Sequence, residues 1–222
     1  MALSNYTNLK TSIANWLNRS DLTTEISDDF IKLVEADMNS KLRIRKMITQ
    51  SSFTINAETE ALPTGFLQVR DIYILSGSTK YPLRYMPPAQ MDQVKGTSQT
   101  GLPLAYTILG DNLRFMPRPD NDYTAIINYY KSFDPLSTTN TTNYILTSHP
   151  SIYLYGSLFH AANFLGGINP QQAQNWQQMY ATSLERLEQN DREDQFSGSP
   201  LQIKGEDTIA SPFKNSYVTT NT

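Results

Sequence analysis

Two histidines and a few closely spaced carboxylates are the side chains in this sequence that could do acid–base or metal chemistry. His149 precedes Pro150, and His160 falls within a long apolar stretch. A metal site or a nucleophile–base pair needs partner ligands or an orienting carboxylate at a suitable spacing, and neither histidine has one. We therefore expect both histidines to be structural, and we predict no catalytic, cofactor-binding or metal-ligating residue.

The closely spaced carboxylates form two pairs. Glu35 and Asp37 lie two residues apart on an expected helix, so their side chains point to different faces. Glu58 and Glu60 lie together beside an expected turn. A glycoside hydrolase needs two carboxylates opposed across one bond, one of them with a pKa raised by burial. Neither pair predicts such an acid, and the glycines between expected strands are too isolated to form a phosphate-binding loop. The sequence therefore does not predict an enzyme.

Tyrosines are a third feature, because aromatic rings can stack on sugars or bases. The chain has 13 tyrosines, and many of them lie in its middle third. Alternating tyrosines are also what a half-buried β-strand prefers, so the pattern favours packing over ligand binding. The tyrosines concerned are Tyr73, Tyr81, Tyr85, Tyr106, Tyr123, Tyr129 and Tyr130.

Composition narrows the class of protein. The formal net charge of −3 and the isoelectric point near 5.4 argue against a general polyanion binder, which would need clustered lysines and arginines. The absence of cysteine excludes a disulfide framework and a cysteine nucleophile. No stretch has the pattern of a signal peptide or a membrane span, so we expect a soluble intracellular protein with no membrane partner.

Helical periodicity marks both ends of the chain. Residues 5–18 repeat apolar side chains at helical spacing. A second helix is expected to begin with Ser27 as its N-cap and to carry an apolar stripe as far as Leu42. The basic residues Lys41, Arg43, Arg45 and Lys46 crowd its expected end. The periodicity returns at 150–165 and, after a glycine pair, over about 169–194.

The residues between these helices follow the two-residue period of β-strands, and prolines keep the strands short. Gly110-Asp111, between two apolar runs, predicts a hairpin turn. A short helix is expected near 88–94. This stretch therefore reads as a small antiparallel β-module.

These segments predict an α+β fold with three parts. The helices of 1–47 and 134–194 form a discontinuous bundle of two helical hairpins, and the antiparallel β-module of 48–133 is inserted between them. Residues 195–222 lose the periodicity and are expected to form an extended C-terminal tail. The tail is too apolar for a simple linker, so we expect it to order on a partner through Phe196, Leu201, Ile203, Ile209, Phe213 and Tyr217.

Acidic residues collect at the end of the last helix, where the helix dipole disfavours them. One interpretation is a frayed and solvated helix end. Another is that these acids meet the basic end of the second helix in a neighbouring subunit, or face an anion that must slide past. The candidates for the inter-subunit charge pair are Lys41, Arg43, Arg45, Lys46, Glu185, Glu188 and Asp191.

Several short motifs follow one another in a specific order along the chain. They include Trp16-Leu17-Asn18-Arg19, Leu62-Pro63, Gly101-Leu102-Pro103, Tyr129-Tyr130, Pro135-Leu136 and Tyr153-Leu154-Tyr155-Gly156. Their order and spacing resemble the head-to-tail adaptor (connector) proteins of tailed bacteriophages, over roughly residues 1–190.

The resemblance implies a structural protein of the virion neck or tail, assembled in the host cytoplasm. It implies a dodecameric ring below the portal protein, joined to a tail or nozzle protein, with DNA passing non-specifically through its channel. In related adaptors a C-terminal extension grips the portal, so the resemblance gives residues 195–222 that role. The alternative is a carbohydrate-binding or peptidoglycan-hydrolysing virion component that acts through the tyrosine-rich β-module.

Overall fold

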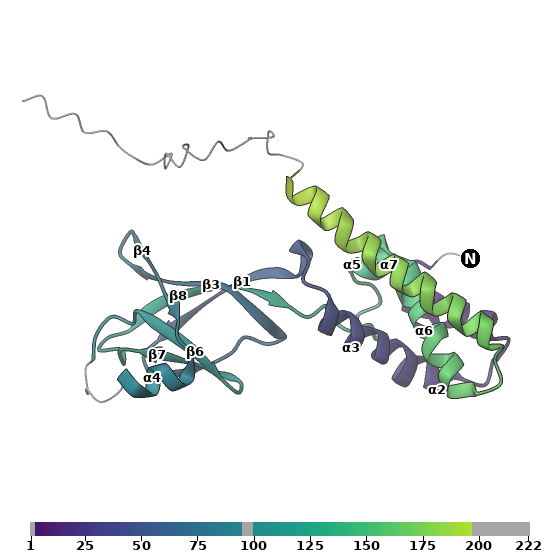
Figure 1. The fold of residues 1–222 in the computed structure, drawn as a ribbon, viewed down its shortest axis with the longest axis horizontal. Helices are drawn as coiled ribbons and strands as arrows, with labels where there is room; N and C mark the ends of the chain where they lie inside the picture. The colour runs from purple at the N-terminus through teal and green to yellow at the C-terminus, as the bar shows by residue number, and fades with distance from the viewer. Residues whose placement is uncertain (1–2, 95–99, 197–222) are drawn as a thin grey trace, which may run out of the picture.

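The computed structural model describes residues 3–94 and 100–196, and it has a mixed α+β fold. Figure 1 shows most helices gathered at one end of the molecule and the strands at the other. The helices are α1 Tyr6–Leu17, α2 Thr23–Glu25, α3 Ile31–Lys41, α4 Pro88–Val94, α5 Tyr144–Ser148, α6 Pro150–Leu165 and α7 Pro170–Phe196, with the π-helical turn η1 Ile26–Phe30 and the 3₁₀ turn η2 Arg45–Met47. The strands are β1 Ile48–Ile55, β2 Thr59–Ala61, β3 Phe66–Ser76, β4 Thr79–Pro82, β5 Arg84–Tyr85, β6 Ala105–Leu109, β7 Asn112–Met116 and β8 Tyr123–Lys131.

The first helix is confirmed, and its ends follow from local capping. The Asn5 side chain accepts a hydrogen bond from the backbone N–H of Asn8, which satisfies a donor that the helix start leaves free. At the other end Asn18 adopts the left-handed conformation, with φ of 51°, and terminates the helix.

The second helix begins earlier than predicted. It begins at Thr23, and Ser27 is not an N-cap: its hydroxyl donates to the carbonyls of Thr23 and Thr24 inside the helix. Because Leu22 and Ile26 are buried, core packing draws this earlier segment into the helix. The helix ends at Lys41, which lies in its last turn as expected, whereas Arg43, Arg45 and Lys46 follow beyond the end.

The later helices lie where they were expected, although α5 was missed. Gly166, with φ of 61°, ends α6 in a left-handed conformation that glycine adopts without strain. The Asn169 side chain accepts from the N–H of Gln171 and caps α7 beside Pro170.

Helices from both ends of the chain share one apolar core. The central helix α6 contacts α1, α3 and α7. Gly156 of α6 allows the closest approach, since an added Cβ would lie 2.7 Å from Val34 Cγ2 and 3.0 Å from Tyr180 Cε2. The fully buried members of this core include Leu9, Ile13, Phe30, Val34, Leu42, Ile145, Ile152, Tyr153, Leu158 and Leu187. The division of the chain into domains stays a prediction.

The strands form two four-stranded sheets, ordered β1-β8-β3-β4 and β2-β7-β6-β5. The predicted turn at Gly110 is confirmed, because it joins antiparallel β6 and β7. The expectation of a purely antiparallel module is wrong in one place: β5 and β6 pair in parallel. The chain between them includes α4, and a crossover of this kind lets two successive strands run in the same direction. Side chains of both sheets share a second core, formed by Ile55, Ile72, Ile74, Leu83, Tyr106, Leu113, Phe115, Ala125, Ile127 and Tyr129.

The tyrosines of the sheets serve packing to different degrees. Tyr106 and Tyr129 are buried in the second core, as the packing interpretation predicted. Tyr81 and Tyr85 are exposed, and the ring of Tyr85 meets that of Tyr106 edge to face, with ring centroids 5.7 Å apart.

Candidate functional site

A network of hydrogen bonds lies at the junction between the helices and the sheets. Glu35 of α3 accepts hydrogen bonds from the backbone N–H of Leu136, at 2.7 Å, and from the hydroxyl of Tyr153, at 3.0 Å. One turn further along α3, Asn39 accepts from the N–H of Phe133 at 3.1 Å. Two side chains of α3 therefore hold the backbone that leads from β8 to α5.

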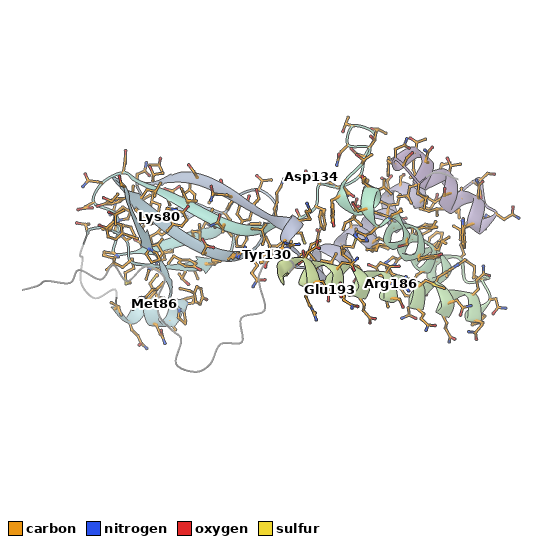
Figure 2. The ribbon with its side chains drawn as sticks, turned by 90° about the horizontal axis from the view of Figure 1, so that it is seen from above. Lys80, Met86, Tyr130, Asp134, Arg186 and Glu193 are labelled. Atoms are coloured by element: carbon orange, nitrogen blue, oxygen red, sulfur yellow. The ribbon has the colours of Figure 1, made fainter. Side chains whose placement is uncertain are left out.

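Asn143 completes this network from the other side of the connection. Its amide nitrogen donates to the Tyr153 hydroxyl, at 2.7 Å, and to the carbonyl of Asp134, at 3.2 Å. Its amide oxygen accepts from the N–H of Leu146 and so caps α5. Figure 2 shows Asp134 and Tyr130 at the narrow waist between the two ends of the molecule. The network fixes the path of the chain where the two parts meet.

Burial raises the pKa of the Glu35 carboxyl, and the hydrogen bonds from Leu136 and Tyr153 offset this only in part. Burial also raises the pKa of Tyr153, and the nearby Glu35 carboxylate raises it further. The expectation that burial raises the pKa of neither paired acid is therefore wrong for Glu35. The helical spacing of the sequence indicates this burial, because Glu35 lies four residues after the buried Ile31 and shares its helix face.

The other member of that pair, Asp37, lies in a different environment. It accepts hydrogen bonds from Lys41, at 2.8 Å, and from the Tyr180 hydroxyl of α7, at 2.7 Å. Burial raises the pKa of Asp37, but these two hydrogen bonds outweigh it and hold the pKa below its ordinary value. Asp37 therefore links α3 to α7 as a carboxylate.

The two histidines are packed against aromatic rings. His149 meets Tyr144 edge to face, and His160 lies beside Phe159. Burial lowers the pKa of each histidine, which favours the neutral ring at pH 7. The described residues, 3–94 and 100–196, contain no group of three or more side chains that could hold a metal ion.

Two of the predicted inter-subunit charges meet within a single chain. The backbone N–H and the guanidinium of Arg45 both contact Asp191 Oδ1, at 3.0 and 3.4 Å. The same guanidinium contacts Asp194 at 3.0 Å. The end of α7 is therefore tied to the segment that follows α3, which gives the acids at this helix end an intramolecular partner.

The remaining candidates do not gather in one place. Lys41 binds Asp37, Arg43 donates to the carbonyls of Leu42 and Asn39, and the Lys46 ammonium lies 5.7 Å from the centre of the Tyr144 ring. Glu188 contacts Arg192 on the helix surface, and Glu185 is exposed. Their role between subunits stays a prediction. So does the role of the tail residues Phe196, Leu201, Ile203, Ile209, Phe213 and Tyr217, whose side chains lie outside the described residues.

Two cavities flank the contact between Lys46 and Tyr144. One, of about 340 Å³, lies toward the sheets and is also lined by Thr49, Lys131 and Asn143. The other, of about 290 Å³, lies toward α7 and is lined by Arg45, Asp191 and Asp194 among others. Both are part of the junction rather than separate sites.

The side chains of Glu35, Asn39 and Asn143 hold the connection between β8 and α5 in place, so their observed contacts are structural. A family model described as SU10 adaptor protein matches residues 4–204. The chain belongs to this family and is a bacteriophage adaptor protein, a structural component of the virion.

A comparison with curated proteins found no match. Within the described residues, no helix combines the length and the apolar character that are needed to cross a bilayer.

Proposed function

We propose that this protein forms a dodecameric ring below the portal, joins the portal to the tail or nozzle, and leaves an axial channel for DNA. The observation that carries the proposal is the match to the adaptor family over residues 4–204. The helices of 1–47 and 134–194, as a discontinuous bundle of two hairpins, would be the body that packs side by side. A ring needs a head-to-tail interface that closes on itself.

The junction supports this function physically. A ring of identical subunits closes only if every subunit holds the same shape. The hydrogen bonds of Glu35, Asn39 and Asn143 fix the connection between helices and sheets in each copy. The net charge of −3 suits a channel from which DNA must be released, because phosphates would not be held by a strongly basic wall.

The direction of α7 supports a portal-gripping tail over residues 195–222. Helix α7 runs from the far end of the helical part back toward the junction, where Asp191 contacts Arg45 (Figure 1). The last described residues of the chain therefore lie at the junction. The protein is proposed to carry out no chemistry of its own, and to be assembled with its partners in the host cytoplasm.

The test is assembly with the portal protein of the same phage. We expect native mass measurement to find many copies of this chain bound to one portal ring, and cryo-EM of the virion neck to place the chain between portal and tail. A chain that stays monomeric beside the portal and is missing from the neck would overturn the proposal.

The contacts within one subunit decide which charge-reversal variants can report on ring closure. Asp191→Lys would break the contact with Arg45 inside the subunit, so a defect in that variant would not report on ring closure. Glu188→Lys affects only a surface pair with Arg192, so impaired assembly in this variant would indicate a contact between subunits.

A further inference from the structure

The distribution of charge over the helices is very uneven. All 18 lysines and arginines and all 21 aspartates and glutamates of the chain lie outside residues 135–184. This stretch builds α5, α6 and the first half of α7. On the first half of α7 the exposed residues are six amides, Pro170, Ala181 and Met179, which is 53% exposed. The amides of this uncharged α7 face are Gln171, Gln172, Gln174, Asn175, Gln177 and Gln178.

The exposed side of α1 also carries few charges. Helix α1 exposes Thr7, Thr11 and Asn15 at helical spacing. Trp16 is 47% exposed at the end of the helix, but it follows the buried Leu9 and Ile13 at helical spacing and its ring meets Tyr155 of α6 edge to face. The sole charged residue of α1 is Lys10. Helix α6 contacts both α1 and α7, and Figure 2 shows those two helices on opposite sides of it. One subunit therefore carries two different uncharged faces that look away from each other.

We propose that the uncharged α1 face of one copy packs against the uncharged α7 face of the next copy. The inference rests on the proposed ring and names the surfaces that would close it. The centres of protein interfaces are depleted in charge and enriched in methionine, as the two faces are here, with Met179 on the α7 side. Hydroxyls and amides of the two faces can pair with each other, so burying them costs less than burying charges.

A second copy explains both faces better than another partner does. A head-to-tail contact uses two unlike surfaces on opposite sides of one subunit, and α1 and α7 supply such a pair. DNA would need cations on at least one of the faces, and α1 offers just Lys10. Glu185 and Glu188 follow directly after the uncharged half of α7, so they would lie at the rim of the contact.

The absence of cysteine from the chain makes the contact testable by cross-linking in assembled necks. The test variant combines Thr11→Cys with Gln178→Cys, both at exposed positions, and uses a bismaleimide with a short spacer. We expect a ladder of linked dimers, trimers and higher oligomers from the double variant, and unlinked chains from each single variant. A matched control combines Gln178→Cys with Thr54→Cys on the outer face of β1, and should give no ladder.

The outcomes separate this inference from the proposed function. A ladder from the double variant alone supports the contact. Linked dimers from either single variant would show that a face meets its own copy, and would overturn the head-to-tail pairing. Necks that contain many copies of the double variant without any links would overturn the pairing while leaving the ring intact. Necks that lack the wild-type chain would overturn the proposed function and the inference with it.

Charge substitutions give a second test of the same pairing. Thr11→Lys combined with Gln178→Lys places like charges on both faces and should reduce the yield of assembled rings about tenfold or more. Thr11→Lys combined with Gln178→Glu should restore assembly, because the two faces would then attract. Equal yields from the two double variants would contradict the inference.

Discussion

At the scale of single residues, burial and the charge of the partner together set the pKa of each acid of α3. Glu35 and Asp37 are two positions apart, yet the pKa of Glu35 is raised and that of Asp37 is lowered. The difference arises because Asp37 has a lysine partner, Lys41, whereas Glu35 has only neutral hydrogen-bond donors. Both acids serve as structural links between elements.

The raised pKa of Glu35 predicts a specific dependence of stability on pH. The unfolded chain releases this proton near the ordinary value of 4.5, and the folded chain releases it at a higher pH. Between these values the folded state binds more protons, so the free energy of unfolding falls as pH rises. Glu35→Gln removes this titration, and the stability of the wild type relative to the variant should decline as pH rises above about 4.5.

Urea unfolding of both proteins across this pH range measures the difference. Glu185→Gln, at an exposed position, serves as the control and should follow the wild type throughout. A difference between wild type and Glu35→Gln that is constant, or that grows with pH, would contradict the assignment of the raised pKa to Glu35.

Gly156 gives a second prediction at this scale. Gly156→Ala would place a methyl group 2.7 Å from Val34 Cγ2, and the β-branched Val34 has little freedom to rotate away. Overpacking costs about 1–3 kcal/mol and the helix propensity of alanine returns about 1 kcal/mol, so we expect a net loss of about 1 kcal/mol in urea unfolding. Gly167→Ala has no such neighbour, and an equal loss there would argue against the close approach.

At the scale of elements, contacts with Arg45 hold the end of α7. Leu187 is its last buried apolar residue among those described, and Asp191 then contacts Arg45. Asp191→Ala should release the last turns at a cost of about 1 kcal/mol, which is roughly a fivefold faster amide exchange over residues 188–194.

Hydrogen exchange followed by mass spectrometry measures this local opening. The matched control is Glu185→Ala, an exposed position on the same helix that should leave the exchange of 188–194 unchanged. Identical exchange in the two variants would show that the contact between Asp191 and Arg45 does not hold the helix end.

Elements were predictable where local signals specify them. The period of apolar residues and the caps predicted α1, α6 and α7, because a helix is stabilised largely by residues within a turn or two of each other. The start of the second helix was not predictable in this way. Its early segment is held by burial of Leu22 and Ile26 in a core that includes the distant α6.

At the scale of the whole molecule, the helices after the sheets pack against the helices before them. Helices from the two ends share one core, and the sheets form another. Core residues therefore come from both sides of the residues that build the sheets. This arrangement leaves residues 197–222 free to be removed without loss of any described core residue.

Truncation after Phe196 tests that separation of fold and attachment. We expect the truncated chain to keep the circular dichroism and the urea midpoint of the full chain. Its attachment to the portal should weaken about tenfold or more, equivalent to at least about 1.4 kcal/mol, if the tail grips the portal. Loss of the helical signal would contradict the first expectation, and unchanged portal attachment would contradict the second.

The sequence by itself determined the α+β class, the places of most helices and strands, and the resemblance to phage adaptors that the family match confirms. Only the tertiary structure decided how Glu35 meets Leu136, 101 residues away, how Arg45 meets Asp191, 146 residues away, and that β5 and β6 run in parallel. Periodicity and capping are set by near neighbours in the chain, whereas burial and ion pairing depend on which distant segments the folded chain brings together.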